Sequence, residues 1–147
     1  MKSLHDPASR TELLTRAKSL SPSSASRWGQ LTAPAMLCHI TDSLRMATGE
    51  LPTRSKNSVL RHWPLKYLIV YLMPFPKGAP TAPELRARAP GEWDAEQANF
   101  SSAIERFAAR DRGLPLPEHP AFGTLSARAW GVLGYRHLDH HLRQFGV

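Results

Sequence analysis

The sequence predicts an all-α fold, a four-helix bundle with one extra short helix and long proline-rich connections. Three observations predict it. Apolar residues recur at intervals of three and four in several long segments, which is the spacing of one helical face. Capping residues, prolines and glycines bound these segments. No segment has a convincing partner for a β-strand, so a helical bundle is the natural way to bury the apolar faces.

The first two helices have clear start signals. Asp6 followed by Pro7 is typical of an N-cap and first helical position, and the apolar stripe runs to Leu20, before a Ser- and Pro-rich loop. A second helix is expected after Thr32, with Pro34 in its first turn, and Gly49 marks its end. The polar, basic residues 52–63 are expected to form a loop.

The run from Leu65 to Met73 is apolar on all sides, and periodicity does not decide between a buried strand and a buried helix. We predict a short buried helix, ended by Pro74, because no partner strand is evident. Residues 74–90 contain five prolines and form an irregular connection. A connection of this length is either a functional lid or a connector laid over the core.

The C-terminal half predicts two long helices. Residues 93–107 are amphipathic, with Gly113 beyond their end, and residues 114–123 form another proline-containing connection. The final helix is expected from about Leu125 to Phe145. Thr124 is a plausible N-cap, and Gly146 follows the C-terminus.

Length and composition indicate one domain, residues 1–147, with an ordinary apolar fraction. The single cysteine, Cys38, is interpreted as a small buried residue and fits a reducing compartment. No signal peptide is evident, and the longest apolar run is far short of the roughly 20 residues that cross a bilayer. We therefore expect a cytoplasmic protein without membrane association.

The net charge of +7 comes from 19 Lys and Arg against 12 Asp and Glu. These basic residues are scattered, and no nucleic-acid-binding motif accompanies them. They indicate a solvated basic surface, and no specific nucleic-acid partner is expected.

The last helix carries two histidines, His137 and His141, one turn apart on the same face. At about 100° per residue, both fall within about 20° of Trp130, in the middle of the apolar face, while Asp139 lies opposite. Buried imidazoles need hydrogen bonds, ordered water or a metal ion to satisfy their nitrogens. This spacing is also how one helix offers two imidazoles to one ion.

His39 borders the apolar face of the second helix and could face that pair across the bundle. Cys38 is adjacent to it and points about 100° away, so the two do not readily bind one ion. The residues therefore indicate a divalent-metal site at His39, His137 and His141. Three imidazoles suit Zn, Ni, Fe or Mn and leave a coordination position open.

The order of elements resembles the DinB/YfiT-like superfamily of metal-binding four-helix bundles. The likeness rests on His39 in MLCHITDSLRM, on His137 and His141 in YRHLDHHLRQFG, and on the segments PLKYLIVYLMPFPKGAPTAPEL and HPAFGTLSARAWGVLGYRHLDHHLRQFG. It covers nearly the whole chain and points to a branch without assigned activity. The resemblance implies an enzyme that uses a low-molecular-weight thiol in S-transfer or isomerisation, with a metal-bound thiolate attacking an electrophile, and a homodimer.

Two function classes therefore stay open: a metal-dependent enzyme acting on a small molecule, and a metal-binding or interaction module without turnover. Leu138 stands where a His-Glu-x-x-His protease has its glutamate, so peptide hydrolysis is disfavoured. Five residues are candidates for a supporting role at the site or its pocket, each with an ordinary structural alternative: Ser43, Glu50, His119, Trp130 and His140.

Overall fold

A computed structural model of the chain describes residues 1–55, 58–78, 81–86 and 88–147. In these residues the regular secondary structure is helical, apart from one isolated bridge between His119 and Gly123. The all-α prediction is confirmed. The four long helices are α1 (Pro7–Lys18), α2 (Ala33–Thr48), α4 (Trp93–Ala109) and α5 (Ala127–Gln144).

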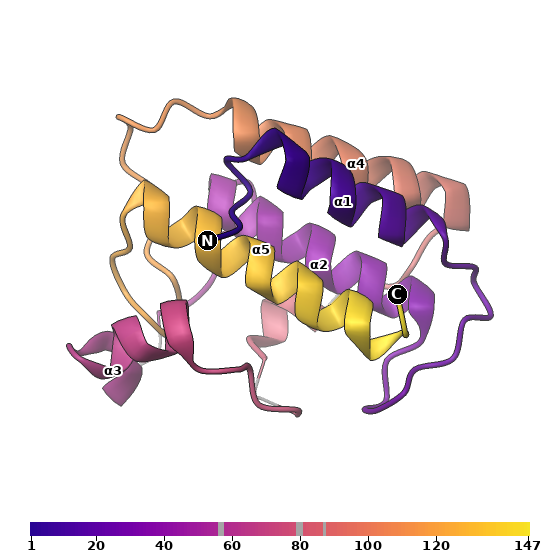
Figure 1. The fold of residues 1–147 in the computed structure, drawn as a ribbon, viewed down its shortest axis with the longest axis horizontal. Helices are drawn as coiled ribbons and strands as arrows, with labels where there is room; N and C mark the ends of the chain where they lie inside the picture. The colour runs from indigo at the N-terminus through magenta and orange to yellow at the C-terminus, as the bar shows by residue number, and fades with distance from the viewer. Residues whose placement is uncertain (56–57, 79–80, 87) are drawn as a thin grey trace.

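The long helices form a closed bundle in which each packs against two others. Helix α2 contacts α4 and α5, and α1 contacts the same two helices from the other side. Figure 1 shows α1 and α4 side by side as one layer and α2 and α5 as the second. Every long helix contributes fully buried side chains to the shared core, among them Leu13, Met36, Phe100 and Leu138.

Capping residues define the helix starts. The side chain of Asp6 accepts a hydrogen bond from the amide of Ser9, and that of Thr32 from the amide of Ala35, as the sequence predicts. Helix α2 ends at Gly49, whose φ of 86° is left-handed and therefore favours glycine.

The start of α5 differs from the prediction. Its N-cap is Ser126, whose Oγ accepts from the amide of Ala129 at 3.2 Å. The hydroxyl of Thr124 instead donates to Glu118. The helix therefore begins at Ala127 rather than near Leu125, because two hydroxyl residues compete for the cap and only Ser126 lies in register with the first turn.

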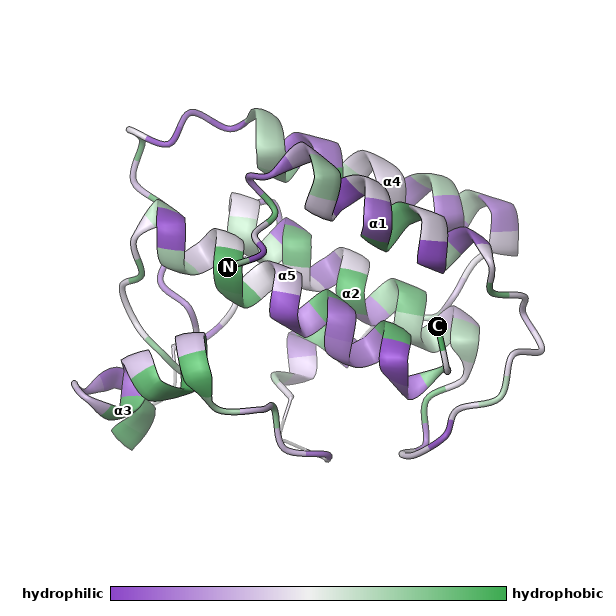
Figure 2. Ribbon diagram, in the orientation of Figure 1, coloured by the Kyte–Doolittle hydropathy of each residue, from purple (hydrophilic) through white to green (hydrophobic). Residues whose placement is uncertain are grey.

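The apolar segment predicted over residues 65–73 is helical but only Val70 is fully buried, so the prediction of a buried helix is wrong. It consists of α3 (Leu65–Tyr67) and a π-helical turn η2 (Leu68–Leu72), and the predicted loop before it contains a 3₁₀ turn η1 (Val59–Arg61). Val70 is fully buried, whereas Leu72 is 69% and Tyr67 49% exposed. The segment lies beside the bundle (Figure 1), and its apolar residues are coloured green outside the core in Figure 2. The four long helices already enclose the core, so only one face of this segment can pack against them.

The guanidinium of Arg136 on α5 holds this segment, because it donates to the carbonyls of Ile69, Val70 and Met73. The following connection, predicted as irregular, contains the 3₁₀ turn η3 (Pro83–Arg86), which packs against α2. Residues 79–80 and 87 of that connection, and residues 56–57 of the predicted loop 52–63, lie outside the described part of the chain. None of the described helices has the length and hydropathy needed to cross a membrane.

Candidate metal centre

His39 enters the site from the middle of α2. Its side chain is 6% exposed. Nδ1 lies 3.2 Å from the carbonyl oxygen of Leu85 in η3. A carbonyl only accepts, so Nδ1 carries the hydrogen and donates it, and Nε2 keeps a free lone pair. The bond therefore fixes the tautomer that leaves Nε2 available as a metal ligand.

His141 on α5 is oriented in a similar way by a side chain. Its Nδ1 lies 2.9 Å from Oε1 of Gln144, while Nε2 of Gln144 donates to the carbonyl of Trp28 at 2.7 Å. Because the amide nitrogen of Gln144 faces a carbonyl, its oxygen must face His141. The imidazole consequently donates through Nδ1, and its Nε2 is also a free acceptor.

The third imidazole, His137, completes the cluster. Its Nε2 lies 3.2 Å from Nε2 of His39 and 3.1 Å from Nε2 of His141. Two nitrogens bound to one zinc ion in tetrahedral geometry lie about 3.4 Å apart, given Zn–N distances of about 2.1 Å. These two separations are close to this value, and the ligand atoms of all three histidines lie within 4.8 Å of one another.

Hydrogen bonding within the cluster does not satisfy all three nitrogens. Nε2 of His39 and of His141 are both acceptors, and His137 has one hydrogen to offer from Nε2. One lone pair is thus left over in an apolar setting, where an unpaired polar atom is costly. With its hydrogen on Nδ1 instead, His137 also offers a lone pair at Nε2, and a cation bound at the centre then uses all three, so the donor set fits a divalent ion.

The surroundings keep these imidazoles neutral. Burial lowers the pKa of His39, lowers that of His141 to about 3, and lowers that of His137 well below its ordinary value, with help from the neighbouring imidazoles. Neutral imidazole is the form that binds a metal ion. His39 is buried in the bundle, whereas His137 and His141 are half-buried.

The comparison with known families decides the membership of the chain. A family described as "Protein of unknown function (DUF1569)" matches residues 3–146. The chain belongs to the DUF1569 family. Neither the curated proteins nor the solved structures contain a significant match to it. The DUF1569 description names no activity, so function must be argued from the site.

Aromatic side chains lie beside His137 and its neighbour His140 in this DUF1569 protein. The ring of Phe75 lies edge-on to His137 and to His140, with centroids 6.3 and 6.0 Å apart. Trp28 packs edge-on against His140 at 5.9 Å, and the ammonium of Lys77 lies 4.5 Å above the Trp28 ring. We call Phe75, Trp28, His140 and Lys77 the rim. The proposed supporting role of His140 thus has a definite position, beside the ligands and outside the cluster of three.

The other candidate supporting residues have structural contacts of their own. Ser43 is buried and donates to the carbonyl of Ile40. Glu50 is exposed and pairs with Arg106. Trp130 is a core residue, 3% exposed.

His119 has a structural role in its turn. Its Nδ1 accepts from the amides of Ala121 and Phe122, and its ring packs on Trp130 with centroids 5.2 Å apart. It is not an exposed loop histidine, and it lies close enough to His137 to contribute to the lowered pKa of that residue.

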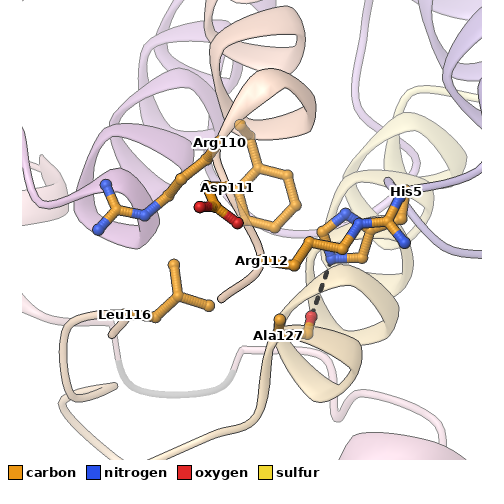
Figure 3. Close-up of a pocket in the computed structure, with 7 residues that line it drawn as sticks. His5, Arg110, Asp111, Arg112, Leu116 and Ala127 are labelled. Atoms are coloured by element: carbon orange, nitrogen blue, oxygen red, sulfur yellow. Dashed lines mark hydrogen bonds between the residues drawn. The ribbon is translucent and has the colours of Figure 1, made fainter. Parts of the chain in front are cut away.

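Figure 3 shows a cavity in a different part of the DUF1569 fold, lined by His5, Phe107, Arg110, Asp111, Arg112, Leu116 and Ala127. Its volume of about 10 Å³ is room for one water molecule. Ala127 begins α5, ten residues before His137, which corresponds to about 15 Å along a helix. The cavity therefore takes no part in the chemistry of the histidine centre.

The residues that orient the histidines do not appear among the sequence candidates. Gln144 had a detectable signal, because it is a polar residue about 40° from Trp130 on the apolar face of α5. The carbonyls of Leu85 and Trp28 had none, since any residue supplies a carbonyl.

Proposed function

We propose that this DUF1569 protein is a metal-dependent enzyme that acts on, or with, a small thiol. His39, His137 and His141 would hold the divalent ion, which is Zn, Ni, Fe or Mn. One observation carries the proposal. Nε2 of His137 lies 3.2 and 3.1 Å from Nε2 of His39 and of His141, the ligand atoms of all three lie within 4.8 Å of one another, and Nδ1 of His39 and of His141 is held by a hydrogen bond.

The number of ligands favours catalysis over a closed structural site. Within the described residues, the cluster contains three histidines and no carboxylate or thiol. Three protein ligands leave a coordination position for substrate, which is the pattern of catalytic sites. When bound, the ion supplies a positive charge that lowers the pKa of a coordinated thiol or water.

The distribution of the ligands supports thiol chemistry. One histidine comes from the second helix of the bundle and a His-x-x-x-His pair from the last. This arrangement resembles the DinB/YfiT-like superfamily, which includes thiol-dependent transferases and isomerases. An S-transfer or isomerisation reaction is the proposal that follows. The cytoplasmic location and the homodimer expected from the sequence stay predictions.

The rim supports a substrate with negative charge. Lys77 pairs with no carboxylate in the part of the chain that the structure describes, and its ammonium lies over Trp28. A thiol that also carries a carboxylate could place that group near Lys77 while its sulfur faces the three histidines. Phe75 and Trp28 would then exclude water from the apolar part of the molecule.

The test is elemental analysis of the purified protein beside the His137→Ala/His141→Ala double variant. Near-stoichiometric metal in the parent, absent from a folded variant, supports the centre and justifies thiol-transfer assays with that metal. A parent that stays metal-free after incubation with zinc, nickel, iron and manganese contradicts the proposal. Tight metal binding with no thiol-dependent turnover would instead identify a metal-binding module without catalytic activity.

A further inference from the structure

A buried ion-pair network lies next to the metal centre, on the side of His39. Arg88 donates to both carboxylate oxygens of Glu96, at 2.5 and 3.0 Å, and its Nε lies 3.4 Å from Asp42. Both carboxylate residues are only 2% exposed. Such a bidentate pair fixes direction as well as distance. The network therefore attaches the chain at Arg88 to two helices, since Asp42 is on α2 and Glu96 on α4.

The segment held by this network is the same one that contacts His39. We call residues 82–86 and 88–91 the tether. Ala82 and Leu85 are buried at its start, and the amide of Gly91 donates to Glu96 at 2.9 Å near its end. Between these fixed points, the carbonyl of Leu85 accepts the hydrogen of Nδ1 of His39. The tether is thus fixed on both sides of the one carbonyl that sets the His39 tautomer.

Asp42 strengthens this connection, because it follows His39 by three residues and lies on the same face of α2. Helix α2 therefore carries both the metal ligand and one anchor of the segment that orients it. Any shift of the tether along α2 changes the distance from the Leu85 carbonyl to Nδ1. Stability alone does not require this arrangement, because a buried ion pair is weak evidence for stabilisation.

From this geometry we propose that Arg88, with Asp42 and Glu96, is a positioning residue for the metal centre, and that it acts through the Leu85 carbonyl to hold His39 in its Nδ1–H tautomer. The role in metal binding rests on the proposed function. The role in fixing the tautomer does not, because it exists in the metal-free protein.

Arg45 provides a matched control. It also pairs with Asp42, at 3.1 Å, and its side chain is 35% exposed against 32% for Arg88. Its other ion-pair partner is Glu50, and within the described residues it makes no hydrogen bond or ion pair to the tether. Arg45→Met and Arg88→Met therefore each remove an arginine from the same carboxylate, and only Arg88→Met releases the tether.

The first measurement is the ¹⁵N–¹H spectrum of the imidazole nitrogens in the metal-free protein. We expect the Nδ1–H form of His39 in the parent and in Arg45→Met, and a mixture with the Nε2–H form in Arg88→Met. If Arg88→Met does not fold, Glu96→Gln tests the same point, since its amide oxygen still accepts from Gly91. An unchanged His39 signal in the folded variant overturns the proposal, whether or not the protein binds metal.

The second measurement is cobalt affinity, with the visible spectrum of bound cobalt as a reporter of coordination geometry. Loss of an outer partner of a ligating histidine weakens metal binding about 10- to 100-fold. We expect this loss and an altered cobalt spectrum for Arg88→Met, and affinity within about twofold of the parent for Arg45→Met. Equal affinity and spectrum in all three proteins overturn the role in metal binding. A parent that binds no cobalt overturns the proposed metal centre, while the tautomer measurement still decides whether Arg88 positions His39.

Discussion

Gln144 and His141 lie one helical turn apart on α5, and the side chain of Gln144 joins Nδ1 of His141 to the carbonyl of Trp28, at 2.9 and 2.7 Å. The residue is 4% exposed. One side-chain amide therefore connects the last helix to the loop before α2 and sets the direction of a candidate metal ligand.

Replacing Gln144 by alanine is expected to weaken metal binding by about 10- to 100-fold, since it removes the outer partner of His141. The change also leaves the Trp28 carbonyl without its donor, and the free energy of unfolding should fall by about 1–3 kcal/mol. Chelator competition and urea unfolding measure the two effects. Arg143→Ala is the control, because that side chain is 72% exposed on the same turn. Equal metal affinity in parent and Gln144→Ala would contradict the role assigned to Gln144.

Gly29→Ala should disturb the contact between Gln144 and the carbonyl of Trp28, because Gly29 follows Trp28 directly. A Cβ at Gly29 would lie 2.6 Å from Nε2 of Gln144, and the φ of 77° is left-handed. Gly78→Ala is a matched control, with a φ of 76° and nothing within 4 Å of its Cβ. Both variants should lose about 1–2 kcal/mol of stability from backbone strain. Only Gly29→Ala should also lose metal affinity, and a loss of equal size in Gly78→Ala would refute this explanation.

The stability of the metal-free protein should depend on the protonation of His119. Burial lowers the pKa of His119 to about 4 in the folded protein, against about 6.5 for an unfolded histidine. Between these values the unfolded chain binds more protons, so stability is full above pH 6.5 and falls as the pH drops toward 4. The loss should be on the order of 1–3 kcal/mol, measured by urea unfolding across this range.

The control for His119 is His119→Asn, because the asparagine oxygen can accept the amides of Ala121 and Phe122 as Nδ1 does. This variant should show a shallower pH dependence than the parent between pH 6.5 and 4. Parallel curves for the two proteins would show that His119 does not titrate in this range.

Cys38 should be unreactive in the folded protein. Its side chain is 3% exposed, and burial raises the pKa of its thiol to about 11. At pH 8 about one molecule in a thousand then carries the reactive thiolate. Thiol-specific reagents should modify the native protein far more slowly than the urea-unfolded protein. Rapid modification of the native form would mean that Cys38 is accessible, and the thiol reaction would then have a candidate nucleophile within the chain.

The sequence was sufficient for the parts of the fold that depend on local rules. The caps at Asp6 and Thr32, the end at Gly49 and the inward face of His137 and His141 all follow from helical spacing and residue type. The N-cap at Ser126 in place of Thr124 and the incomplete burial of residues 65–72 did not follow. Hydropathy marks a segment as apolar, but the volume left inside the bundle decides whether it is buried.

The partners of the histidines were beyond sequence reasoning for a related reason. Leu85 is 46 residues from His39, and Trp28 is 116 residues from Gln144, and both act through backbone carbonyls. No residue type predicts a contact made by a backbone carbonyl. Only the packed bundle brings these atoms together.

The distribution of the three histidines along the chain has a kinetic consequence. His137 and His141 are four residues apart, but His39 and His137 are separated by 98. An ion bound by all three would therefore cross-link α2 to α5 and close a very long loop, which the chain can form only after the two helices have docked. Such an ion should slow unfolding and have little effect on the rate of folding, because its third bond forms late.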